Sequence, residues 1–270
     1  MHQDNTTLIY FSPTGTTRTI LGQIAKGLGK NEFTTIDITN AEVRSRPAPK
    51  FGDGLVLMGA PVYAGRLPKE ASDYFKTIQA SGSAAILIVL YGNREFEDAL
   101  LELKNIAVDS GFIPLAAAAF IGEHSFSSKD TPIAQNRPDA GDQHKAFLFG
   151  QDIANFLPRI KTASALSFVD VPGNLPYRDG LAMGPFSFID VTDACDGCGI
   201  CIPACPKDAI DETARYAPIE KECIFCCACI KACPPQARIM KESPLREKAV
   251  FLSETCSQRK EPRLFMPWKQ

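Results

Sequence analysis

Nine of the ten cysteines in this 270-residue chain lie between Cys195 and Cys233. The segments ACDGCGICIPACPKDAI (194–210) and ECIFCCACIKACPPQAR (222–238) align without a gap, and each reads C-x2-C-x2-C-x3-C-P. A repeat at a constant offset indicates an internal duplication. Four thiolates hold a cubane iron–sulfur cluster, and these short spacings let three thiolates face one cluster while the fourth reaches another. The pattern predicts two 4Fe-4S clusters.

Other uses of clustered cysteines agree less well with this spacing. Zinc ribbons separate two C-x2-C pairs and do not place three evenly spaced cysteines before a C-P. Disulfides need an oxidising compartment, whereas the N-terminus, MHQDNTTLIYF, lacks the basic start and apolar stretch of a signal peptide. Cys227 aligns with Gly199, which cannot be a ligand, so Cys227 and the isolated Cys256 are expected to be buried or idle thiols.

Over about residues 187–240 the duplicated motif resembles the two-cluster bacterial ferredoxins. The resemblance implies a small α+β domain in which the two motifs exchange their fourth cysteines. The ligands carried over are Cys195, Cys198, Cys201 and Cys233 for one cluster, and Cys223, Cys226, Cys229 and Cys205 for the other.

The first half of the chain alternates apolar runs with helical patterns. Short β-branched or leucine-rich strands, each followed by a helix or loop, predict a doubly wound α/β domain with a five-stranded parallel sheet. The expected strands are 6–11, 33–39, 54–60, 84–91 and 112–120, and the expected helices are 17–29, 67–80, 94–111 and 142–156. Ligands of such sheets bind beyond the carboxyl ends of the strands.

Three loops at that edge carry residue types suited to a binding site. The first, SPTGTTRT, surrounds Gly15 with hydroxyls directly before a helix, whose unpaired N–H groups suit a phosphate. A Ser/Thr-capped helix that binds nothing is the alternative, and the absence of Gly-Lys-Ser/Thr excludes a Walker loop. The loops PVYAGR (61–66) and YGNREF (91–96) each bring a glycine and an aromatic side chain to the same edge.

This arrangement resembles the flavodoxin family over roughly residues 5–160. The resemblance implies bound FMN, with its phosphate in the first loop and its ring flanked by the other two. The matching residues are Ser12, Thr14, Gly15, Thr16 and Thr17; Pro61, Val62, Tyr63, Ala64, Gly65 and Arg66; and Tyr91, Gly92, Asn93, Arg94 and Phe96. Arg66 and Arg94 depart from the acidic flavin surroundings of many flavodoxins. A guanidinium near the ring would raise the flavin potential; a solvated surface arginine is the alternative.

The expected domains are an FMN-binding domain at 1–160, a linker at 161–186, a ferredoxin domain at 187–240 and a basic tail at 241–270. This order resembles the flavodoxin–ferredoxin fusion proteins of anaerobic bacteria and archaea. It implies an electron carrier that passes electrons between the two clusters, FMN and a redox protein or small acceptor. The alternative is an FMN-dependent oxidoreductase that reduces a specific small substrate. A third reading, a redox sensor, lacks a visible DNA-binding or signalling segment.

The composition is that of an ordinary globular protein, with 45 % hydrophobic and 22 % charged residues. A net charge of −2 gives no argument for binding to nucleic acid or to an anionic membrane. No apolar run approaches the roughly 20 residues of a membrane helix. We therefore expect a cytoplasmic protein. His124, in the loop after the fifth strand, lies near the ligand edge and is expected to be a loop residue.

Overall fold

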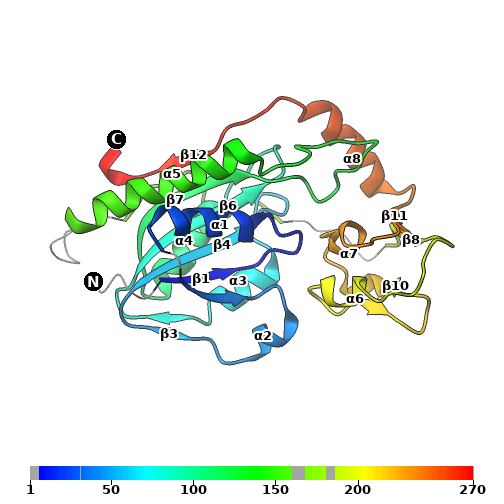
Figure 1. Ribbon diagram of the computed structural model, residues 1–270, viewed down its shortest axis with the longest axis horizontal. Helices are drawn as coiled ribbons and strands as arrows, with labels where there is room; N and C mark the ends of the chain where they lie inside the picture. The colour runs from blue at the N-terminus through cyan, green and yellow to red at the C-terminus, as the bar shows by residue number, and fades with distance from the viewer. Residues whose placement is uncertain (1–5, 31, 160–167, 181–185, 270) are drawn as a thin grey trace.

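The computed structural model describes residues 6–30, 32–159, 168–180 and 186–269. Parts of the expected linker, 161–167 and 181–185, lie outside these residues. The first domain is built around a sheet with the strand order β12-β7-β6-β4-β1-β2, in which β12 is Arg263–Phe265 from the C-terminal tail (Figure 1). The five strands from the first half are parallel, as predicted; they are β1 (Thr6–Tyr10), β2 (Thr34–Asp37), β4 (Leu55–Pro61), β6 (Ala84–Tyr91) and β7 (Ile113–Ile121).

Helices cover both faces of the sheet, which confirms the doubly wound α/β class. Side chains of a strand point alternately to its two faces. Ile9 and Met58 therefore join one buried cluster, while Leu8 and Leu57 join the other. The first cluster includes residues of α3 (Lys69–Phe75) and α4 (Ala99–Asp109), and the second includes residues of α1 (Thr16–Gly27) and α5 (Ala140–Phe156).

Two glycines allow α1 and α5 to pack closely. A Cβ atom on Gly27 would lie 2.0 Å from the carbonyl oxygen of Phe147, and one on Gly150 would lie 2.2 Å from that of Ile24. The remaining short elements of this domain are α2 (Ala41–Ser45), β3 (Lys50–Phe51), β5 (Gln79–Ala80) and the 3-10 turn η1 (Leu157–Arg159). The strands β3 and β5 pair in parallel as a separate two-stranded sheet.

The cysteine-rich segment folds as two interleaved halves. Its elements are β8 (Ile189–Val191), α6 (Cys201–Ala204), β9 (Ile210–Asp211), β10 (Ala217–Pro218), η3 (Glu220–Glu222), α7 (Ala228–Lys231) and β11 (Arg238–Met240). The first strand of each repeat pairs antiparallel with the last strand of the other, β8 with β11 and β10 with β9. The duplication seen in the sequence is therefore also a duplication of structure.

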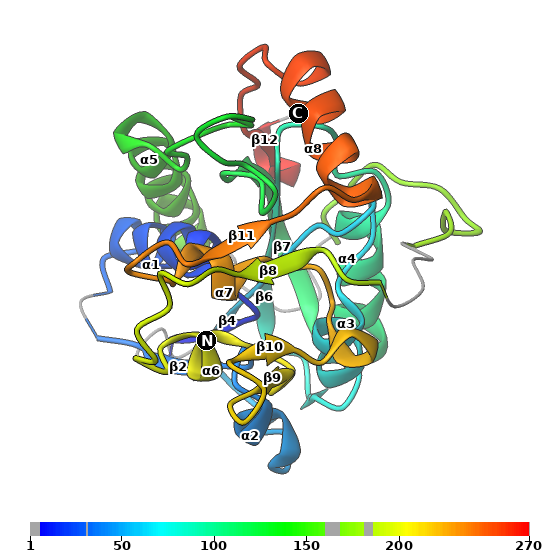
Figure 2. The ribbon, with the colours of Figure 1, turned by 90° about the vertical axis from the view of Figure 1, so that its right-hand side faces the viewer.

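The cysteine-rich domain faces the carboxyl ends of the parallel strands (Figures 1 and 2). Polar contacts join the two domains. The Nζ atom of Lys231 in α7 lies 2.5 Å from Oε1 of Glu123 and donates to the carbonyl of Ser127 at 2.6 Å. Lys207 pairs with Glu70 at 3.2 Å. The clustered cysteines are thus held against the sheet edge at which ligands of α/β proteins bind.

The C-terminal tail returns to the first domain, a position that the sequence left open. After α8 (Pro244–Thr255), the strand β12 (Arg263–Phe265) adds to the sheet antiparallel to β7, as the red segment of Figure 1 shows. The 3-10 turn η4 (Pro267–Lys269) follows, and its Trp268 ring stacks on Phe156 with centroids 3.8 Å apart. The sixth strand was not predicted.

The described part of the linker packs on the first domain. The N–H of Val169 donates to the carbonyl of Pro114 at 3.0 Å, and Val169 is fully buried. The carboxylate of Asp98 accepts hydrogen bonds from the N–H groups of Asn174 and Arg178, at 2.9 and 2.8 Å. Residues 168–178 are therefore anchored to the neighbourhood of α4.

Among the described helices, none combines the length and the apolar character that crossing a membrane requires.

Candidate functional site

A pocket lies at the carboxyl edge of the sheet, where all three predicted loops converge. Its lining includes Ser12, Pro13, Thr14, Thr16 and Thr17 from the first loop, Pro61, Val62 and Tyr63 from the second, and Leu90, Tyr91 and Gly92 from the third. A fourth loop, 122–125 after β7, completes the lining and was not among the predicted site residues.

The first loop has the geometry of an anion site at a helix N-terminus. Gly15 is the N-cap of the 12-residue helix α1 and has a φ of 80°, a left-handed conformation that favours glycine. No acidic residue occupies the first turn of the helix. Thr17 lines the pocket and is fully buried, and its hydroxyl has no hydrogen-bond partner in the described structure. An orphaned hydroxyl beside a helix N-terminus suits a phosphate oxygen.

The second and third loops place only some of their predicted residues in the pocket lining. Ala64, Gly65, Arg66, Asn93, Arg94 and Phe96 lie outside it. Arg66 makes a two-point contact with the buried carboxylate of Glu102, at 2.8 and 2.9 Å, and lies over the ring of Tyr177. Arg94 pairs with Glu97 at 2.6 Å. Both arginines are thus paired with carboxylates outside the pocket lining.

His124, in the fourth loop, packs against the third loop. A Cβ atom on Gly92 would lie 2.2 Å from Cδ2 of His124, so only glycine admits the ring at this position. The Nδ1 atom accepts a hydrogen bond from the N–H of Phe126 at 3.0 Å, which leaves the proton of the neutral ring on Nε2. Burial, helped by the charges of Arg94 and Lys231, lowers the pKa of His124 to about 4. His124 is therefore a neutral group in this pocket at pH 7.

The thiols of the first predicted ligand set line one cavity. Cys195, Cys198, Cys201 and Cys233 all border it, together with Arg238. Burial raises the pKa of the Cys201 thiol, and the nearby Cys233 and Cys195 raise it further. Cys233 belongs to the second motif, so its presence beside three cysteines of the first matches the exchange of fourth cysteines that the resemblance implies.

The second predicted set is more deeply buried. Burial raises the pKa of the Cys226 thiol, and Cys229, Cys223 and Cys205 add to the rise. The backbone N–H of Ala209 also donates to the sulfur of Cys205 at 3.3 Å. Within the described residues, the side chains do not already form a group of three or more metal ligands. The four cysteines of the first set are grouped by the cavity that they line. Those of the second set are grouped by the effect of neighbouring thiols on the pKa of Cys226.

Cys227 occupies a position that its repeat partner explains. Its φ is 55° and that of the aligned Gly199 is 71°, so both repeats use the same left-handed conformation before a short helix. Cys227 is 2 % exposed, and its thiol lies 3.7 Å from the carbonyl of Phe225. The expectation that it is a buried thiol agrees with this position.

Tyr63 lies where the flavin-type pocket meets the second set of cysteines. Its side chain lines the pocket, and burial raises the pKa of its hydroxyl well above the usual value. The thiols of Cys226 and Cys227 add to that rise. Tyr63 and Cys223 also border one cavity of about 520 Å3 between the domains.

Arg238 provides a chemical test of whether the cysteines suit an anionic metal cluster. This arginine is 3 % exposed, and its Nε and Nη2 atoms have no hydrogen-bond partner in the described structure. A buried guanidinium is costly unless negative charge compensates it. Thiolates bound to iron would supply that charge, so the donor set fits an iron–sulfur cluster. The sequence signal was a break in the repeat, because Arg238 aligns with Ile210.

Comparisons with known families agree with both halves of this description. Residues 7–107 match the flavodoxin domain family, and residues 189–211 match the 4Fe-4S binding domain family. The second match spans the first cysteine motif. A search of curated proteins found no match.

Several solved structures are similar to the first domain. Oxidised flavodoxin 2 from Bacillus cereus is 18 % identical over 57 % of this chain and 99 % of its own, with a TM-score of 0.40. The FMN-bound flavodoxin from Fusobacterium nucleatum is 16 % identical over 57 % of this chain and 97 % of its own, with a TM-score of 0.36. The flavodiiron core of Synechocystis Flv1 is 19 % identical over 58 % of this chain, which covers 36 % of that protein, with a TM-score of 0.39.

The two family matches and the strand topology lead to one conclusion. The chain carries an N-terminal flavodoxin domain joined to a C-terminal ferredoxin-type 4Fe-4S domain, and it is in general terms an electron-transfer protein of the flavin and iron–sulfur class.

Proposed function

We propose that this chain passes electrons between two 4Fe-4S clusters and one FMN, and exchanges them with a redox protein or a small acceptor. The observation that carries the proposal is the position of Tyr63, which lines the pocket of the three flavin loops and also borders a second cavity together with Cys223 of the inner ligand set. One residue is thus part of the surroundings of both proposed cofactors. Joining the sites on one chain replaces a diffusional encounter with a high effective concentration.

The residues available to each cofactor are distinct. The helix N-terminus at Gly15 and the hydroxyl of Thr17 would hold the FMN phosphate, and Tyr63, Tyr91 and Gly92 would flank the ring. The ligand sets would be Cys195, Cys198, Cys201 and Cys233 for the outer cluster, and Cys223, Cys226, Cys229 and Cys205 for the inner one. When bound, the cofactors supply the redox chemistry, and the protein supplies binding, orientation and electrostatics.

Exposure supports an order of transfer. Cys198 of the outer set is exposed, whereas Cys226 and Cys229 of the inner set are 6 % and 7 % exposed. The inner set is also the one whose Cys223 borders the same cavity as Tyr63. We therefore propose that a partner exchanges electrons with the outer cluster and that the inner cluster connects it to the flavin.

His124 favours the carrier over an oxidoreductase with its own small substrate. A proton donor works best when its pKa is near the operating pH. With a pKa of about 4, His124 is almost entirely neutral at pH 7 and acts as a hydrogen-bond donor through Nε2. The pocket lining offers no histidine besides His124 among its described residues.

Anaerobic purification followed by cofactor analysis and electron exchange tests this function. We expect about eight irons and eight acid-labile sulfides per chain and FMN as the released flavin. The reduced protein should pass electrons to ferredoxin-like carriers faster than to a panel of small organic substrates. About four irons or bound FAD would contradict the cofactor proposal. Rapid turnover of one small substrate, with slow exchange with carriers, would instead favour the oxidoreductase.

A further inference from the structure

The side chain of Arg238 lies between the two sets of thiols. It projects from β11, whose partner across the ladder at this position is Val191 of β8. Its Nη1 atom donates to the carbonyl of Tyr216 at 2.5 Å and lies 3.8 Å from the sulfur of Cys201. Its Nε and Nη2 atoms remain without partners in the part of the chain that the structure describes.

The neighbours of Arg238 belong to both ligand sets. Its side chain borders the cavity that the four cysteines of the outer set line. Cys229 of the inner set lies in the same buried cluster as Cys201, and it belongs to α7, which packs against β11. Among the described residues, no carboxylate forms an ion pair with Arg238. Thiols therefore occupy the positions around Arg238 where a carboxylate would normally balance its positive charge.

The fold itself does not require a cation at this position. The aligned residue of the first repeat is Ile210, which packs at the edge of the apolar cluster of this domain. In the other half of the duplication an isoleucine thus fills the equivalent position by apolar packing. A buried guanidinium without a paired carboxylate is strongly unfavourable. Arg238 consequently needs an explanation that Ile210 does not.

We propose that Arg238 is a shared positioning residue for the two clusters, which holds one positive charge and two unpartnered donor nitrogens, Nε and Nη2, between them and raises the reduction potential of both. This inference rests on the two-cluster proposal above. Each one-electron reduction adds one negative charge to a cluster, and a nearby cation stabilises that added charge. Hydrogen bonds to cluster sulfurs and nearby charge are known determinants of cluster potentials.

Two substitutions in the full-length protein separate charge from packing. Arg238→Ile installs the residue of the other repeat, and Arg238→Gln keeps an N–H donor without the charge. Arg215→Gln is the control, because this arginine is 70 % exposed and pairs with the fully exposed Asp193. Cluster midpoints are measured by an anaerobic reductive titration followed by EPR, together with iron content and the flavin midpoint.

We expect both Arg238 variants to keep the wild-type iron content while both cluster midpoints fall. At a fixed potential, the ratio of reduced to oxidised cluster should drop at least tenfold, equivalent to about 59 mV for a one-electron couple. The flavin midpoint and the Arg215→Gln midpoints should change much less. Unchanged cluster midpoints in a fully loaded variant, or a shift in only one cluster, would overturn the proposal.

Two further outcomes are distinguishable. Loss of iron from both Arg238 variants would assign the residue a structural role and overturn the tuning role. If the wild-type protein itself contains about four irons, the two-cluster proposal fails. The shared role of Arg238 would then fall with it, because only one cluster would be present.

Discussion

The side-chain amide of Asn93 donates hydrogen bonds to the backbone carbonyls of both Cys256 and Gln258, at 2.6 and 2.8 Å. Its Oδ1 atom accepts from the N–H of Lys260 at 3.3 Å. Asn93 belongs to the third predicted flavin loop, is 2 % exposed and has a φ of 64°. The C-terminal tail therefore fixes the conformation of a loop whose neighbours Tyr91 and Gly92 line the flavin pocket.

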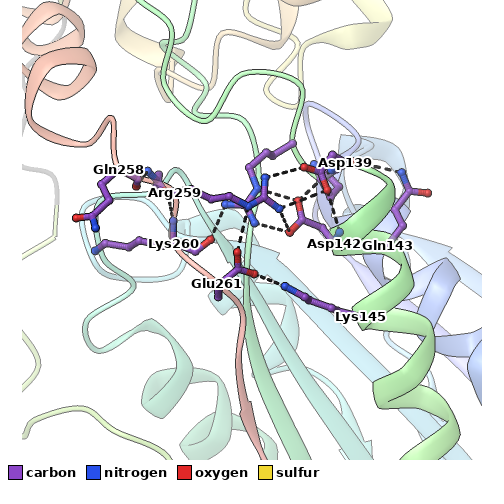
Figure 3. Close-up of polar contacts among 11 residues, drawn as sticks. Asp139, Asp142, Gln143, Lys145, Gln258, Arg259, Lys260 and Glu261 are labelled. Atoms are coloured by element: carbon purple, nitrogen blue, oxygen red, sulfur yellow. Dashed lines mark hydrogen bonds and ion pairs between the residues drawn. The ribbon is translucent and has the colours of Figure 1, made fainter.

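A second set of contacts attaches the same tail segment to the start of α5 (Figure 3). The guanidinium of Arg137 donates to the carbonyl of Lys260 at 2.7 Å and pairs with the fully buried Asp142. Arg259 contacts the partly exposed Asp139 at 2.7 Å and Glu261 at 3.1 Å, and it reaches the buried Asp142 at 3.4 Å. The buried contacts should stabilise the fold more than the exposed ion pairs, which are screened by water.

Asn93→Gly should weaken both the protein and its FMN binding. Glycine keeps the left-handed backbone at this position, so the substitution removes only the side-chain hydrogen bonds. We expect the free energy of unfolding to fall by about 1–3 kcal/mol, because two hydrogen bonds from a buried side chain are lost, each worth about 0.5–1.5 kcal/mol. FMN should bind several-fold more weakly. Chemical denaturation and fluorescence titration with FMN measure the two effects.

Glu261→Gln is the matched control in the same tail segment, because within the described structure Glu261 pairs only with the partly exposed Lys145 and Arg259. Exposed ion pairs contribute about 0–1 kcal/mol, so this variant should stay near wild type in both measurements. Equal losses in Asn93→Gly and Glu261→Gln would show that the tail acts as a whole and not through the buried amide.

Cys226→Ser and Cys227→Ser should differ sharply in iron content. Cys226 lies among Cys223, Cys229 and Cys205, whereas Cys227 aligns with a glycine of the other repeat. We expect Cys226→Ser to lose the inner cluster, about four irons per chain, and Cys227→Ser to keep the full content. Iron and sulfide analysis of anaerobically purified variants decides. A comparable loss in both would refute the proposed ligand set.

The sequence was sufficient where a pattern was long or repeated. The continuous apolar runs of β4, β6 and β7 predicted buried parallel strands, and the offset between Cys195 and Cys223 revealed the duplication. The strand β12 has only three residues, Arg263–Phe265, and no alternating pattern, so its pairing with β7 was not visible. Such a strand forms because the edge of the sheet is available to it.

The directions of side chains in the loops were harder to predict than the loops themselves. Arg66 faces Glu102 because α4 packs beside the second loop, and these residues are 36 positions apart in the chain. The contribution of the fourth loop depends on how closely His124 approaches Gly92. Both are consequences of tertiary packing, which residue spacing alone does not encode.

Gly92→Ala should impair FMN binding by displacing His124. The added methyl group would lie 2.2 Å from Cδ2 and 2.7 Å from Cβ of His124, too close for the ring to avoid by rotating only its tip. We expect the dissociation constant for FMN to rise at least tenfold. Gly22→Ala in α1 is the control, because a Cβ atom there meets nothing within 4 Å. FMN affinity at the wild-type level in Gly92→Ala would contradict the proposed pocket.

His124 should make stability depend on pH. Because its pKa is about 4 in the folded protein and 6.5 in an ordinary setting, the unfolded chain binds more protons between these values. Stability from this group is therefore present above pH 6.5 and is lost as the pH falls toward 4. From pH 7.5 to 5.5 its contribution should decrease by about 1.4 kcal/mol.

The comparison that isolates this effect is wild type against His124→Gln, measured by anaerobic chemical denaturation at both pH values. Carboxylates elsewhere contribute equally to the two proteins, so the difference between them reports His124. A stability difference between wild type and variant that is the same at pH 5.5 and 7.5 would show that His124 does not resist protonation.

The proposed exchange of electrons between the clusters and the flavin takes place within one chain. An anaerobic reductive titration of the full-length protein tests it most directly, with the clusters followed by EPR and the flavin by absorbance. We predict that two cluster signals develop and that the flavin is reduced in the same titration, by electrons that enter at the clusters. A flavin that remains oxidised after the clusters have been reduced would contradict the account.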